Sequence, residues 1–218
     1  MRRGWWIAAS AALVVGVACS DNVGPGACFE PNATGYAFYN EQADSTFVFR
    51  WPGSNLPVRV YAEPVGELQA NTLAAMQLWV NAFRCNELSM QVTSDSARAD
   101  IIIRNPPALP PLVTAFVIAV DSVGACRGVT VFDTAQSALD APMRAYVSPV
   151  AFDSAAVAAC YRFVTAHELG HALGLLSHSP DTADLMHPRP RRRLLTAADR
   201  YTIQRLYHTT PTIGPPPR

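Results

Sequence analysis

The alternation of apolar and polar residues divides the chain into strand and helix candidates. Alternation with a period of two predicts strands at residues 45–51 and 57–62, because successive strand side chains face opposite sides. Residues 99–104 are apolar almost throughout, which predicts a strand that is buried on both faces. Four more segments have strand-like composition: 88–93, 112–120, 128–133 and 144–150.

Three segments have the spacing and composition of helices. The first two cover residues 66–84 and 154–174, and the last begins at Thr196 and ends near His208. Thr196 and Asp199 have the spacing of a capping box, which fixes the start of that last helix. Strands and helices in this order predict an α+β or α/β fold with one sheet and about three helices.

The first residues have the pattern of an export signal. In residues 1–18, Arg2 and Arg3 precede an apolar run that is too short for a membrane span. The residues before Cys19 resemble a bacterial lipobox, in which the cysteine is lipidated, although Gly16 stands where such boxes usually carry Leu. Both a lipoprotein signal and a plain secretory signal therefore fit, and either places the protein in the cell envelope or outside the cell.

The rest of the chain predicts one domain with extensions. We expect a tether and a first strand region at 19–55, the main domain at 56–208, and a disordered Pro-rich tail at 209–218. Charged residues make up 16% of the 218 residues and the formal net charge is zero, so nucleic acid is not an expected partner. A membrane is expected as a partner only through the lipid anchor, and a monomer is the default.

Four cysteines remain when Cys19 is set aside: Cys28, Cys85, Cys126 and Cys160. An even number of cysteines in an exported protein predicts two disulfides, for which three connectivities exist. We favour Cys28–Cys85 with Cys126–Cys160. No C-x-x-C spacing supports metal binding by these residues.

The stretch HELGHALGLLSH holds three of the five histidines. Residues four apart on a helix share one face, so His167 and His171 can direct two imidazoles at one metal ion. Glu168 is rotated from His167 by about 100°, which places it beside the ion as a base rather than as a ligand. This is the H-E-x-x-H arrangement of metallopeptidases.

A glycine follows the second histidine and allows a third ligand. Gly174 can adopt a positive φ and turn the chain out of the helix, so that His178 can return to the ion. Three histidines leave one coordination position open, as in catalytic zinc sites. The same three ligands would also accept cobalt, nickel or copper.

The sequence from His167 to His178 resembles the zinc signature of the metzincins and, more narrowly, of the matrixins. Asp184-Leu185-Met186-His187-Pro188 is similar to the matrixin segment that ends in the Met-turn. In this resemblance Met186 is the Met-turn methionine, which lies under the zinc as an apolar base. The likeness covers about residues 56–208.

The resemblance implies a zinc endopeptidase of the α+β metzincin class that cuts extracellular proteins or peptides. It implies a twisted mixed sheet, about three helices, and a zinc cleft between an upper and a lower subdomain. The substrate would pair with an edge strand, for which we favour 128–133. Glu168 would act as general base. Calcium stays open, because the Asp- and Gly-rich loops of animal matrixins are not found.

Three departures from the matrixin pattern raise alternatives. His187 follows Met186 where matrixins often have Tyr, and it could approach the site or line the cleft wall. The propeptide cysteine switch is absent, which leaves Cys28 as the only latency ligand if it is not in a disulfide. The arginines within 189–193 could contact acidic side chains or form a solvated loop. A non-catalytic zinc-binding or adhesive surface lipoprotein with the same fold is the alternative function.

Overall fold

The computed structural model of the protein describes residues 25–42, 45–106, 116–117, 121–123, 126–135, 138–149 and 154–214. The expected export signal and Cys19 lie outside the described residues. Within these ranges, no helix combines the length and the apolar character that crossing a membrane requires.

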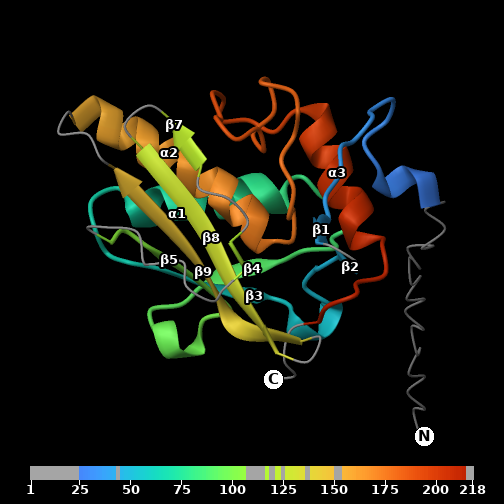
Figure 1. Ribbon diagram of the computed structural model, residues 1–218, viewed down its shortest axis with the longest axis horizontal. Coiled ribbons are helices and arrows are strands. Elements are labelled where there is room, and N and C mark those ends of the chain that lie inside the picture. Colours follow the sequence, from blue (N-terminus) through green and yellow to red (C-terminus); the bar gives the residue numbers. More distant parts are fainter. Residues whose placement is uncertain are drawn as a thin grey trace, which may run out of the picture.

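A seven-stranded mixed sheet is the centre of the fold (Figure 1). Its strands are β3 (Val58–Ala62), β4 (Met90–Val92), β5 (Ile101–Arg104), β6 (Phe116–Val117), β7 (Asp121–Val123), β8 (Cys126–Ala135) and β9 (Ala138–Pro149). The order is β4-β3-β5-β9-β8-β6, and β7 also pairs with β8. The first four strands of this order are parallel, whereas β8 runs antiparallel to β9, β6 and β7.

Two helices cover the sheet and a third stands beside it (Figure 1). Helix α1 (Leu68–Val80) packs on β3 and β4, α2 (Ser154–Ala172) packs on β8 and β9, and the two helices pack on each other. Helix α3 (Ala197–Tyr207) begins with the capping box of Thr196 and Asp199 that the sequence predicts. The α+β class, the mixed sheet and the three helices are therefore confirmed.

The remaining elements are short. They are a hairpin of β1 (Asn40–Gln42) and β2 (Ser45–Phe47), and three 3-10 helices, η1 (Pro25–Cys28), η2 (Gly53–Asn55) and η3 (Ser96–Arg98). The strand expected at 45–51 is thus only three residues long. Beyond it, Phe49 forms an isolated parallel bridge with Ile213.

The outer side of β8 differs from the expectation of a free edge at residues 128–133. Val131 and Phe132 pair with β6, and Gly128 pairs with Asp121 of β7. The expected free edge is therefore wrong over these positions. The alternation of side chains along a strand shows its two faces, but it does not show whether a neighbouring segment of the same chain completes its hydrogen bonds.

The segment expected to be a tether packs on the domain instead. Cys28 forms a disulfide with Cys85, Glu30 forms an ion pair with Arg200 of α3 at 3.1 Å, and Tyr36 contacts Asp199. In Figure 1 this blue segment runs beside the red helix α3. The interpretation as a tether is wrong for these residues, because their Gly- and Pro-rich composition specifies turns and not a lack of contacts.

The chain after α3 also packs on the domain where it is described. Thr212 donates its backbone N–H to the carbonyl of Val48 at 2.9 Å, and Ile213 is 3% exposed. The expected disorder of the tail is therefore wrong up to Gly214, and residues 215–218 lie outside the described residues.

Candidate metal centre

Helix α2 carries the first two histidines of the motif on one buried face. His167 and His171 are 0% and 1% exposed, so neither imidazole is solvated as a surface histidine would be. The backbone of α2 is held by two tryptophans, because Trp79 donates its indole N–H to the carbonyl of Ala166 at 2.8 Å and Trp51 donates to Ala172 at 3.0 Å. These contacts fix the helix against the core and place both imidazoles.

Gly174 turns the chain after α2, as the sequence predicts. Its φ is +112°, a conformation that favours glycine. A Cβ atom at this position would overlap the carbonyl oxygen of Phe49. After the turn, Leu176 donates its N–H to the carbonyl of Phe38 at 2.9 Å, which holds the segment that leads to His178.

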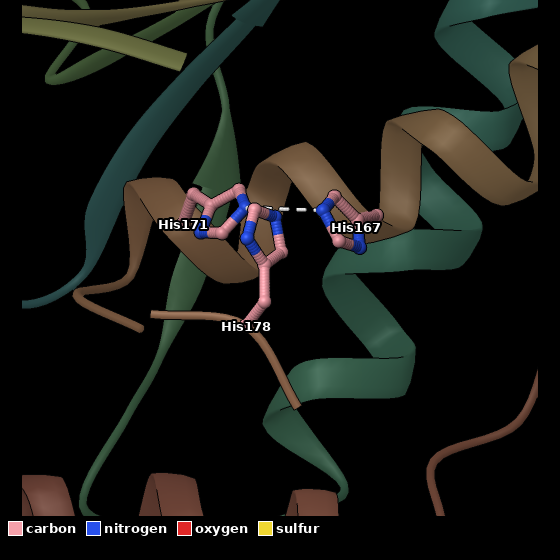
Figure 2. A group of neighbouring side chains, drawn as sticks. All are labelled: His167, His171 and His178. Atoms are coloured by element: carbon pink, nitrogen blue, oxygen red, sulfur yellow. Dashed lines mark hydrogen bonds between the residues drawn. The ribbon is translucent and has the colours of Figure 1, made fainter. Parts of the chain in front are cut away.

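The three imidazoles converge (Figure 2). The Nε2 atom of His171 lies 3.0 Å from that of His167 and 3.3 Å from that of His178. The other ring nitrogens of His167 and His171 face the backbone carbonyls of Leu185 and Leu175. A carbonyl accepts a hydrogen bond only from an N–H, so each Nδ1 carries a proton, and in the neutral imidazole each Nε2 then carries a lone pair.

This arrangement fits a metal ion. Two lone pairs at 3.0 Å repel each other unless a proton or a metal cation lies between them. Ligands at 2.0–2.1 Å from a tetrahedral zinc ion are separated by about 3.3 Å, which is close to the two observed spacings. Backbone carbonyls behind the ligating rings are also the usual outer partners of zinc-bound histidines.

Met186 lies beneath α2, as expected of a Met-turn residue. It is completely buried, and a Cβ atom on Gly170 would lie 2.5 Å from its sulfur and 2.6 Å from the Trp79 ring. Glycine at this helix position therefore lets Met186 approach the backbone of α2 between residues 167 and 171 of the sequence. Met186 belongs to the apolar support of the site and not to the group of potential ligands.

Asp199 links the Met-turn to helix α3. Its buried carboxylate accepts hydrogen bonds from the backbone N–H groups of Leu185 at 2.9 Å and Met186 at 3.4 Å, and from the Tyr36 hydroxyl at 2.7 Å. Burial and, next, the charge of Asp199 raise the pKa of Tyr36 well above its usual value, so the phenol stays protonated and donates. Since Leu185 also accepts from His167, this network fixes the orientation of one of the three imidazoles.

Glu168 lies against strand β8. The side chain is 0% exposed, and its Oε2 accepts a hydrogen bond of 2.6 Å from the hydroxyl of Thr130. The sequence motif indicated Glu168, but the spacing within one helix could not indicate its partner on a strand 38 residues earlier. Thr130, Asp199 and Tyr36 are thus polar residues whose roles at the site the sequence did not reveal.

Other candidate residues lie outside this centre. Of the described residues, only His167, His171 and His178 form the histidine group that could hold a metal ion. The Nδ1 atom of His187 instead accepts the backbone N–H of Arg189 at 3.1 Å. The arginines at 189, 191, 192 and 193 are exposed.

Both disulfides have the connectivity that the sequence analysis favoured. Cys28 pairs with Cys85, and Cys126 of β8 pairs with Cys160 of α2. The first bond removes Cys28 as a latency ligand for the metal. Two disulfides fit a protein that is exported from the reducing cytoplasm.

Comparison with known proteins supports the same family. No curated protein sequence matches the chain significantly. The family model described as matrixin matches residues 115–208, a range that contains strand β8, the three histidines, the Met-turn and helix α3. The match supports a matrixin-like metzincin over this part of the chain.

Proposed function

We propose that the protein is a zinc-dependent endopeptidase that hydrolyses peptide bonds in proteins outside the cytoplasm. The observation that carries the proposal is the convergence of three histidine Nε2 atoms, with Glu168 next to the first ligand on the same helix. The matrixin match supports a metalloprotease in general.

His167, His171 and His178 would hold the zinc ion. When bound, zinc supplies Lewis-acid polarisation of a carbonyl group and lowers the pKa of a water molecule toward neutrality. Glu168 takes one proton from the attacking water as the new C–O bond forms. It then gives this proton to the amide nitrogen as the C–N bond breaks, so that the products are a carboxylic acid and an amine.

The alternative function is a zinc-binding or adhesive protein without turnover. That function needs the three ligands but no carboxylate beside them. Glu168 is present, fully buried and held by a hydrogen bond from Thr130, which is the environment of a positioned group. This observation favours the peptidase.

Removal of the metal is expected to abolish hydrolysis reversibly. Residues 20–218, produced in an oxidising compartment, should contain about one zinc ion per chain by elemental analysis. A chelator should remove both the zinc and the cleavage of casein or of a mixed peptide library, and added zinc should restore both. About one zinc per chain with no cleavage of any substrate would favour the alternative function.

Attachment to a membrane through a lipid on Cys19 is a further part of the proposal. The Cys19→Ala variant of the full chain, expressed in a bacterial host, should move from the membrane fraction to the soluble fraction. The measurement is immunoblotting of the two fractions, with Cys28→Ala as a control for the loss of a cysteine. A Cys19→Ala protein that stays in the membrane fraction would contradict the lipid anchor.

A further inference from the structure

Strand β8 and helix α2 meet along one face of each. Cys160, Val164 and Glu168 are spaced by four residues, so they share one face of α2. On β8, the residues at 126, 128 and 130 are spaced by two and share the face that points to the helix. Along these two faces Cys126 lies opposite Cys160, Gly128 lies opposite Val164, and Thr130 lies opposite Glu168.

We propose that Gly128 and Thr130 form a carboxylate seat, in which Gly128 leaves the space for the Glu168 side chain and Thr130 orients it. This inference rests on the proposed function, because it assigns Thr130 as a positioning residue for the general base. It extends the site beyond the histidine motif to a strand that precedes the motif in the chain.

Thr130 supplies the directional contact of the seat. It is 0% exposed, and its hydroxyl lies 2.6 Å from Oε2 of Glu168 and 3.1 Å from the backbone carbonyl of the same residue. A hydroxyl carries one hydrogen, so the shorter contact to the charged oxygen takes it. The bond fixes one carboxylate oxygen on β8 and thereby sets the direction of the other.

Gly128 supplies the space of the seat. A Cβ atom built on Gly128 would overlap both Oε1 of Glu168 and Cγ1 of Val164. Those atoms belong to the helix face itself, so any side chain at 128 has to displace the carboxylate or separate the strand from the helix. The missing side chain of Gly128 and the hydroxyl of Thr130 therefore both determine the position of the Glu168 carboxylate.

The disulfide between Cys126 and Cys160 fixes the register of the strand face against the helix face. Cys126 and Cys160 join the strand to the helix two residues before Gly128 and eight residues before Glu168. A shift of one residue along β8 would turn Thr130 away from the helix, since alternate strand residues face opposite sides. The covalent bond excludes that shift, so it keeps the hydroxyl opposite the carboxylate.

Positioning matters because Glu168 has to accept a proton from one direction and deliver it in another. Loss of the Thr130 bond removes a directional contact from the carboxylate, and a misplaced general base transfers protons less efficiently. Loss of the hydrogen-bond partner of a metal ligand typically costs about 10- to 100-fold in metal affinity or activity, and we expect a loss in activity of the same order for this partner of the base. The loss should fall on kcat and not on KM or zinc content, because both hydrogen-bond contacts of the Thr130 hydroxyl are to Glu168.

The test compares Thr130→Val, which removes the hydroxyl at nearly constant shape, with Thr130→Ser, which keeps it. The zinc-loaded proteins carry ¹³C-labelled glutamate, and the chain has six glutamates, so the carboxyl signal of Glu168 can be assigned with Glu168→Gln. We expect Thr130→Val to move this signal and to lower kcat by about 10- to 100-fold with unchanged KM and zinc content. Thr130→Ser should return the signal and most of kcat.

Two further variants complete the design. Thr72→Val removes a hydroxyl that is equally buried in α1 and should change neither the signal nor kcat. Gly128→Ala should displace the Glu168 signal with zinc retained, which tests the seat even if Thr130→Val does not fold.

An unmoved Glu168 signal in Thr130→Val, or a Thr130→Ser protein that behaves like Thr130→Val, would overturn the proposal. An inactive wild-type protein would contradict the proposed function, while the carboxyl signals would still test the seat.

Discussion

Replacement of Glu168 by alanine is expected to abolish peptide-bond hydrolysis while the fold and the bound zinc remain. The carboxylate is not part of the histidine group that could hold the metal, so its removal leaves the ligands intact. A positioned general base contributes about 10²- to 10⁴-fold to the rate, and the loss in kcat should be of this order. The measurements are kcat on a peptide substrate, zinc content by elemental analysis and the circular dichroism spectrum.

Two variants control this experiment. Glu168→Gln keeps the shape of the side chain but cannot accept the proton in the same way, so it should lose activity like Glu168→Ala. Glu67→Ala removes an exposed carboxylate at the start of α1 and should keep the activity of the wild type. Undiminished turnover in Glu168→Ala would contradict the assigned role of Glu168.

Replacement of His171 by alanine is expected to remove the zinc ion and, with it, activity and stability. His171 is the central ligand, because its Nε2 lies close to the Nε2 atoms of both other histidines. A ligand that binds only the folded state adds about 2.7 kcal/mol at a free concentration one hundred times its dissociation constant. The variant should therefore unfold at a lower temperature than the zinc-loaded wild type, and added zinc should not raise that temperature.

His187→Ala is the matched control for the loss of a histidine. The ring of His187 contacts the backbone of Arg189 and lies outside the group of three, so this variant should keep about one zinc ion per chain. Stoichiometric zinc in His171→Ala, or loss of zinc in His187→Ala, would show that the assigned ligand set is wrong.

The local features of the fold were predictable from the sequence because their causes are local. The capping box of Thr196 and Asp199 depends on a spacing of three residues, and the turn at Gly174 depends on the freedom of one glycine. The pair of histidines on α2 depends on the helical repeat. Each of these patterns involves only a few consecutive residues.

The contacts between distant segments were not predictable in the same way. Thr130 meets Glu168 across 38 residues, and Tyr36 meets Asp199 across 163 residues. The periodicity of apolar residues shows which face of a helix or strand is buried, but it does not show which polar group lies on the element that packs against that face. The pairing of β6 and β7 on β8 was missed for the same reason, because a hydrogen-bonded backbone edge leaves no side-chain pattern.

The position of Phe49 has a consequence for when the site can form. Its carbonyl packs against Gly174 in the turn before the third histidine, and its backbone pairs with Ile213 near the end of the chain. A chain is synthesised from its N-terminus, so this support of the turn is complete only after Ile213 has been added. The nascent protein therefore lacks the completed turn before His178 until synthesis has passed Ile213, and chain order itself delays the assembly of the three histidines.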